Sequence, residues 1–211
     1  MGVKASVNVK QSSGNKKVFA IVTPANLLEV KGHRYLVEAC LILIKHGVKN
    51  FQCIFYGEGP LRVKLENLIK RKSLANYVKM PGAIFHERLI EMYMNKKVDT
   101  VILSSINTSK GEHEGIPVSL MEAMAHKIPT ISTNTGGILE LLSDGAGIVV
   151  EEKNPGQLAN AIEILLKNQK LRDKIGTKGY QRVVEEFNVS INAARLLEVI
   201  KDQNLPKWKS N

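Results

Sequence analysis

The sequence predicts an α/β protein built on a doubly wound, Rossmann-like parallel sheet of about six strands with helices on both faces. Three observations support this prediction. Short apolar segments alternate with segments of helical length, no linker interrupts the alternation, and glycine-rich turns follow the apolar segments. Strands that are apolar throughout are typical of parallel sheets, because helices cover both of their faces.

The predicted strands are short, apolar and bounded by turn residues. They span residues 17–24, 50–57, 77–82, 98–105, 129–133 and 147–150. The segments between and after them have the length and periodicity of helices. The predicted helices span residues 31–47, 60–74, 87–96, 117–125, 137–143, 155–167, 170–186 and 190–202. Since no strand follows residue 150, the last three are extra C-terminal helices.

We expect a single domain over residues 17–203, preceded by a flexible connector at 1–16 and followed by a tail at 204–211. A chain of 211 residues can bury a core without disulfides or a structural metal. Cys40 and Cys53 lack metal-ligand spacing and lie in apolar stretches, so we predict reduced core residues. Such residues suit a reducing compartment.

Charge and hydropathy narrow the class of partner. The formal net charge of +10 indicates an anionic partner, but the basic residues are spread over predicted surface helices, which favours a solvated surface over a dedicated polyanion site. Aromatic residues make up only 5% of the chain, so we expect no nucleic-acid partner that stacks on them. We find no membrane-span pattern and no secretory signal. We therefore expect a cytoplasmic protein whose basic surface permits peripheral contact with the inner face of a membrane.

The predicted topology locates the ligand site. In open parallel sheets, ligands bind beyond the carboxyl ends of the strands, near the point where the strand order reverses. Most of the polar and glycine-rich turns of the chain follow predicted strands, at residues 23–31, 57–60, 82–86, 104–117 and 133–137.

The helix predicted from Pro117 is a candidate anion site. Proline fits the first helical position, where its missing N–H costs nothing. The amides of Val118, Ser119 and Leu120 would then point into the cleft, and free amides at a helix N-terminus bind phosphate.

Two carboxylates and one lysine are candidate functional residues. Glu122 lies in the same helix, which is apolar nearly all round and predicted to be buried. It either pairs with a lysine or arginine at the core edge or accepts hydrogen bonds from two sugar hydroxyls. Glu114 precedes the helix, and by itself is more typical of a solvated loop acid. Lys31 lies where the first loop becomes a helix, and it is a weak signal for a diphosphate cation.

Two glycines support a ligand site after the second strand, and several well-known nucleotide, metal and hydrolase motifs are absent from the sequence. Gly57 and Gly59 follow the second strand and would allow close backbone approach to a ligand. The sequence contains no G-x-G-x-x-G or P-loop pattern, no D-x-D pair, no G-x-S-x-G, no H-E-x-x-H and no C-x-x-C.

Four sequence blocks together resemble one enzyme family. They are "EVKGHRYLVEA", "YGEGPLRVKLENLI", "EGIPVSLMEAMA", and the run "IPTISTNTGGILELLSDGAGIVVEEKNPGQLANAI". In this order they resemble the C-terminal, donor-binding domain of a retaining glycosyltransferase with the GT-B fold, of family 4 or "glycosyl transferases group 1". The resemblance extends from about residue 18 to residue 197, and its most specific part is the pair of glutamates at 114 and 122.

The resemblance implies roles for these residues. Lys31 would hold the donor diphosphate, Glu122 the ribose hydroxyls, and Glu114 would contact the transferred sugar near its anomeric carbon. Glu114 and Lys31 are thus the expected catalytic residues. The loop at residues 81–84 would face the base. The remaining donor-binding residues expected are Asn26, Gly57, Gly59, Gly82, Ile84, Gly115, Ile116, Pro117, Val118, Ser119 and Leu120.

The sequence departs from the family pattern at two points. Ala25 and Asn26 stand where many relatives carry Gly-Arg, which leaves Lys31 more of the diphosphate charge. We also expect the N-terminal, acceptor-binding domain of the family to be absent from this chain.

The resemblance therefore implies a donor-binding domain that takes a nucleotide-diphosphate sugar, for transfer to a saccharide or lipid-linked acceptor. We expect no cofactor or metal, and weak or no transfer by this domain alone. The alternative is a non-catalytic nucleotide-sugar-binding subunit that pairs with a separate acceptor-domain chain.

Overall fold

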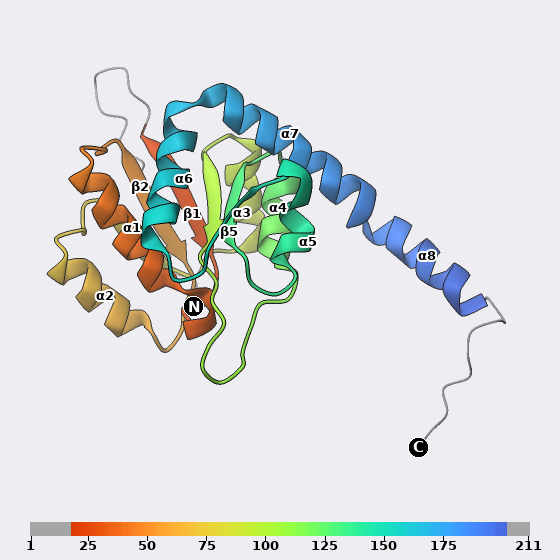
Figure 1. The fold of residues 1–211 in the computed structure, drawn as a ribbon, viewed down its shortest axis with the longest axis horizontal. Coiled ribbons are helices and arrows are strands. Elements are labelled where there is room, and N and C mark those ends of the chain that lie inside the picture. Colours follow the sequence, from red (N-terminus) through yellow and green to blue (C-terminus); the bar gives the residue numbers. More distant parts are fainter. Residues whose placement is uncertain (1–17, 202–211) are drawn as a thin grey trace.

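The computed structural model describes residues 18–201, which form a six-stranded parallel sheet with helices on both faces (Figure 1). The strand order is β3-β2-β1-β4-β5-β6. The strands are β1 (Phe19–Pro24), β2 (Phe51–Tyr56), β3 (Val78–Gly82), β4 (Thr100–Leu103), β5 (Thr130–Thr133) and β6 (Ile148–Val150). This order reverses between β1 and β4, as in doubly wound nucleotide-binding folds. The predicted fold class is confirmed.

Helices form two layers around the sheet. They are α1 (His33–Lys45), α2 (Arg62–Arg71), α3 (His86–Met94), α4 (Val118–Ala125), α5 (Ile138–Leu142), α6 (Pro155–Lys167), α7 (Gln169–Glu186) and α8 (Val189–Lys201). Residues of α1, α2 and α6 pack with one face of the sheet in a first core cluster, whereas residues of α3, α4 and α5 pack with the other face in a second.

The apolar strands explain this layering. Alternate side chains of β1 enter opposite clusters: Ile21 packs in the first and Val22 in the second, and both are fully buried. A strand whose neighbouring residues are both buried needs helices on both faces. Cys40 and Cys53 are both buried and reduced in the first cluster, as predicted.

The observed strands begin and end within two residues of the predicted ones, and the helices differ only slightly. The first helix starts at His33 rather than at residue 31, because Glu29–Lys31 form a short 3-10 helix (η1) that ends at Gly32. The predicted connector at 1–16 and the tail at 204–211 lie outside the described residues.

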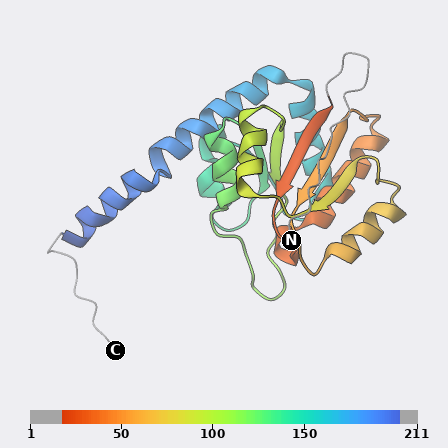
Figure 2. The same ribbon diagram turned by 180° about the vertical axis from the view of Figure 1, so that it is seen from behind.

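Two helices extend beyond the sheet. The first part of α7 contacts α4 and α6, and α8 then continues away from the sheet (Figures 1 and 2). Its exposed apolar side chains include Val189, Leu196, Leu197 and Ile200. Among the described helices, none combines the length and the apolar composition that a membrane span requires.

Candidate functional site

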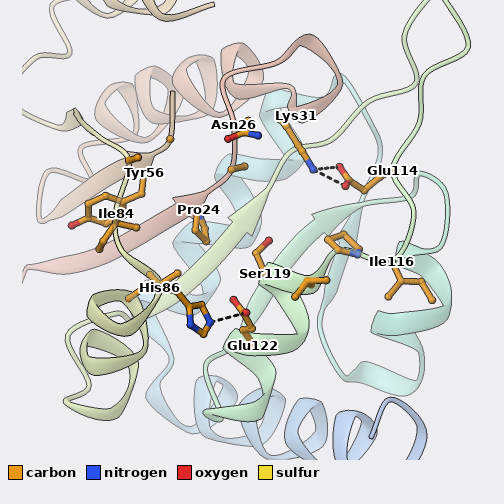
Figure 3. Close-up of a pocket in the computed structure, with 16 residues that line it drawn as sticks. Pro24, Asn26, Lys31, Tyr56, Ile84, His86, Glu114, Ile116, Ser119 and Glu122 are labelled. Carbon is orange, nitrogen blue, oxygen red and sulfur yellow. Dashed lines mark hydrogen bonds and ion pairs between the residues drawn. The ribbon is translucent and has the colours of Figure 1, made fainter. Parts of the chain in front are cut away.

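A cleft of about 540 Å³ opens at the carboxyl ends of the strands (Figure 3). It adjoins Pro24, the last residue of β1, and Tyr56, the last residue of β2. Its lining residues are Pro24, Ala25, Asn26, Lys31, Tyr56, Gly57, Ala83, Ile84, His86, Leu89, Glu114, Ile116, Pro117, Val118, Ser119 and Glu122. The cleft therefore lies where parallel sheets of this topology bind ligands.

One end of the cleft holds an ion pair between Lys31 and Glu114. The Lys31 Nζ donates to both carboxylate oxygens of Glu114, at 2.6 and 2.8 Å, and the hydroxyl of Ser105 donates to Oε2 at 3.1 Å. The side chains of Lys31 and Glu114 are only 21% and 11% exposed. Glu114 thus has three hydrogen bonds in a partly buried position, and it is not a solvated loop acid.

Backbone contacts fix both residues of this pair. On the Lys31 side, the amide of Ile106 donates to the carbonyl of Val30 at 2.8 Å, and Ser104 Oγ donates to the Gly32 carbonyl. On the other side, Gly136 has a φ of +52° and lies against Glu114; a Cβ there would be 1.7 Å from the Glu114 carbonyl oxygen. Only glycine can approach this closely, so the turn at residues 134–137 supports the Glu114 backbone.

The other end of the cleft holds a second acid. Glu122 Oε1 lies 2.9 Å from Nε2 of His86, the first residue of α3. The Glu122 side chain is 27% exposed and faces the cleft, and Val118 on the same helix is 61% exposed (Figure 3). The prediction of a buried helix is therefore wrong on this side of α4. Within residues 18–201 the partner of Glu122 is His86, and no lysine or arginine of this part of the chain pairs with it.

The N-terminus of α4 lies between the two acids. Pro117 is the N-cap rather than the first helical residue, and its carbonyl accepts from the amides of Leu120 and Met121, at 3.1 and 3.3 Å. The Leu120 amide is therefore already paired, contrary to the expectation of a free one. Val118 and Ser119, which line the cleft, precede the first of these bonds and present the unpaired end of the helix.

An apolar wall adjoins the His86–Glu122 end. It contains Tyr56, Ile84 and Leu89 (Figure 3). Burial raises the pKa of the Tyr56 hydroxyl. Burial, together with the charge of Glu122, likewise raises the pKa of Tyr93 in α3. Both phenols therefore stay neutral at physiological pH, and the wall offers an uncharged surface to a planar group.

An uncharged histidine, His33, follows Lys31 by two residues and begins α1. His33 is 1% exposed, contacts the edge of the Phe55 ring, and has no hydrogen-bond partner for either ring nitrogen among residues 18–201. Burial, and secondarily the charge of Lys31, lowers the pKa of His33 to about 4. His33 therefore adds no positive charge to this end of the cleft at neutral pH.

Most of the residues expected from the sequence come together in the cleft. Those that line it are Asn26, Lys31, Gly57, Ile84, Glu114, Ile116, Pro117, Val118, Ser119 and Glu122. Gly59, Gly82, Gly115 and Leu120 are not among the lining residues. The two glycines after β2 serve the packing of loops: a Cβ would lie 2.1 Å from the Ala25 oxygen at Gly57, and 2.7 Å from the Leu27 oxygen at Gly59.

Sequence reasoning missed three residues of the cleft region. His86 and Ser105 lie in the turns at residues 82–86 and 104–117, and Tyr56 begins the block "YGEGPLRVKLENLI". The sequence analysis placed these segments near the ligand, but it gave none of the three side chains a role in the site.

Two further features bear on the chemistry. Within residues 18–201, no group of three or more histidine, cysteine, aspartate or glutamate side chains has the arrangement of a metal site. A separate hollow of about 520 Å³ is lined by Lys64, Asn67, Lys70 and Arg71 of α2.

Comparison with known proteins identifies relatives. The family model "Glycosyl transferases group 1" matches residues 6–182. The putative colanic acid biosynthesis glycosyltransferase WcaL of Salmonella typhimurium is 34% identical over 185 residues, which cover 85% of this chain and 45% of that protein. The amylovoran biosynthesis glycosyltransferase AmsK of Erwinia amylovora is 30% identical over 95% of this chain and 49% of its own. The chain spans about half the length of these curated relatives.

Solved structures share the fold. The C-terminal domain of the glycosyl transferase group 1 protein LpcC from Francisella tularensis has a TM-score of 0.68 at 26% identity, covering 81% of this chain and 87% of that one. Anabaena HepE, solved in complex with UDP, has a TM-score of 0.76 at 20% identity, covering 87% of this chain and 49% of its own. The sheet thus matches the Rossmann-like C-terminal domains of GT-B glycosyltransferases, and the chain belongs to the glycosyl transferases group 1 family.

Proposed function

We propose that this chain is the donor-binding domain of a retaining glycosyltransferase, and that it binds a nucleotide-diphosphate sugar in the cleft between Lys31 and His86. The observation that carries the proposal is the placing of one cation, one helix N-terminus and two acids around a single cleft. A nucleotide sugar presents the matching groups in order: base, ribose, diphosphate and sugar.

Each part of the donor has a partner in this proposal. The base lies against the wall that includes Tyr56 and Ile84, and Glu122 accepts hydrogen bonds from the ribose. The diphosphate meets the α4 amides and Lys31, because helix N-termini and ammonium groups stabilise phosphate. Glu114, held beside Lys31, then lies next to the transferred sugar.

The ion pair suggests how leaving-group stabilisation begins. In the structure the Lys31 ammonium is paired with the Glu114 carboxylate, at 2.6 Å from Nζ to Oε1. A diphosphate draws the ammonium away, and Glu114 keeps the Ser105 hydroxyl as a donor. The positive charge then meets the charge that develops on the departing diphosphate, which is the interaction that speeds transfer.

We propose that the domain needs no metal or other cofactor, since Lys31 and the α4 amides supply the positive charge. We also propose that a domain preceding this one in the relatives' longer chains supplies the acceptor site, so that this chain alone transfers sugar weakly. A cleft with one wall missing admits water to the reaction. The acceptor in this proposal is a saccharide or a lipid-linked saccharide.

Isothermal titration calorimetry tests the proposal. The 211-residue chain is titrated with UDP-glucose, GDP-mannose and ADP-glucose, with and without EDTA. We expect one of them to bind, with unchanged affinity in EDTA, and Lys31→Ala to weaken binding by about tenfold to a hundredfold through loss of a charged hydrogen bond.

Lys64→Ala is the matched control, because it removes the same charge from the separate hollow on α2. It should leave the affinity within about twofold, since exposed charges contribute little. Absence of binding by all three donors, or equal losses in the two variants, would overturn the proposed function.

A further inference from the structure

The contact between His86 and Glu122 joins the first residue of one helix to the middle of another that is distant in sequence. His86 begins α3, Glu122 lies in α4, and the ring nitrogen is 2.9 Å from the carboxylate oxygen (Figure 3). Within residues 18–201, His86 is the one side chain that hydrogen-bonds to the Glu122 carboxylate. Glu122 thus depends on His86 for its orientation.

Stability alone does not account for this contact. The side chains of His86 and Glu122 are 61% and 27% exposed, and such surface pairs contribute little to folding. Both side chains line the cleft, whereas the core of this layer is formed by buried apolar residues such as Leu120. The contact fixes a functional group without strengthening the fold.

The geometry favours recognition of a diol. His86 holds Oε1, so that Oε2 and the second lone pair of Oε1 remain for a ligand. Two neighbouring hydroxyls that donate to one carboxylate require a fixed carboxylate plane, whereas a single hydroxyl can follow a rotating one. A side chain that is ordered in advance lowers the entropic cost of binding.

We propose that His86 is a positioning residue that holds Glu122 against the 2′- and 3′-hydroxyls of the donor ribose, and so selects ribonucleotides over 2′-deoxyribonucleotides. The inference rests on the proposed function, because it takes a nucleotide as the ligand of the cleft.

The test compares two ligands that differ by one hydroxyl. The chain is titrated with UDP, GDP and ADP, and the tightest binder is then compared with its 2′-deoxy form. We expect the wild type to prefer the ribose form by at least about tenfold, the value of one hydrogen bond to a charged group. His86→Ala should lower this preference to about threefold or less and weaken the ribose form alone, because the deoxy form makes no diol contact.

Two further variants separate positioning from structure. His86→Gln keeps an N–H donor and should restore most of the preference. His113→Ala removes an exposed histidine of the loop after β4 and should change neither affinity. Circular dichroism checks that each variant is folded.

The outcomes are distinct. If the wild type binds the two forms equally, or if His86→Ala weakens both by the same factor, the inference is wrong while the proposed function stands. If no nucleotide binds the wild type, the proposed function fails and the inference with it.

Discussion

The two ends of the cleft are built differently. At one end, Glu114 has two bonds from Lys31, one from Ser105, and a glycine backbone pressed against its own backbone. At the other end, Glu122 has one bond, from the exposed His86. The first end is fixed by the fold before any ligand arrives, whereas the second is fixed by one side chain. Chemistry needs the more exact geometry, and the better-fixed acid is the one proposed to lie beside the transferred sugar.

The largest expected effect is that of a substitution at Gly136, which lies against the backbone of Glu114. Gly136→Ala places a methyl group 1.7 Å from the Glu114 oxygen, at a φ of +52°. We expect a loss of at least about 3 kcal/mol of unfolding free energy, measured by denaturant titration, because the backbone has to move. Nucleotide affinity should fall as well, since Glu114 and Lys31 shift together.

Gly111→Ala is the control for this variant. Gly111 has a φ of +80° and nothing within 4 Å of the added Cβ, so only the backbone cost of about 1 kcal/mol remains. Equal losses for the two variants would show that Gly136 does not support Glu114.

The second-largest expected effect is the pH dependence of stability that arises from His33. His33 has a folded-state pKa of about 4 against an ordinary value of 6.5, so the unfolded chain binds a proton in this window and the folded chain does not. Stability is therefore complete above pH 6.5 and falls as the pH drops to 4, by about 3 kcal/mol in total. His33→Leu should remove this part of the acid sensitivity in denaturant titrations at pH 7, 5.5 and 4.5.

His113→Gln, at an exposed position, should keep the wild-type pH profile. A His33→Leu variant that loses stability between pH 7 and 4.5 as steeply as the wild type would contradict the role given to burial.

The sequence predicted the frame of the site well and its internal contacts poorly. Uniformly apolar strands predicted the parallel sheet, and the sheet predicted the edge at which Lys31, Glu114 and Glu122 line one cleft. Their pairing could not be predicted in this way. Lys31 and Glu114 are separated by 83 residues, and His86 and Glu122 by 36, so these contacts depend on loop paths that periodicity does not encode.

Glu122 illustrates the same limit from within one helix. The apolar residues of α4 predicted burial on all sides, but one side of this helix forms the cleft wall, where Val118 is 61% exposed. An apolar residue fits a buried position and a ligand-binding surface equally well, so composition does not distinguish the two.

The third prediction separates the two acids by the sign of their effects. Glu114→Gln releases Lys31 from its ion pair, and we expect affinity for the preferred nucleoside diphosphate to rise by about threefold to tenfold. Glu122→Gln removes the charged acceptor for ribose, and affinity should fall by about tenfold. Calorimetry on both variants measures the difference, and changes of the same sign would refute the assignment of the two ends.

The smallest expected effect is that of removing the Ser105 hydroxyl, which donates to Glu114. Ser105→Ala removes the 3.1 Å hydrogen bond to Oε2, while Lys31 still holds both oxygens in the free protein. Unfolding free energy should therefore fall by about 1 kcal/mol or less, and nucleotide affinity by about threefold, because Glu114 loses its remaining donor only when Lys31 turns to the diphosphate. Ser132→Ala, which removes a buried hydroxyl bonded to the Leu103 carbonyl at 2.7 Å, should cost similar stability without changing affinity. Affinity losses of the same size in both variants would contradict this role. Ser105 would then stabilise only the fold, and would not help Lys31 to move from Glu114 to the diphosphate.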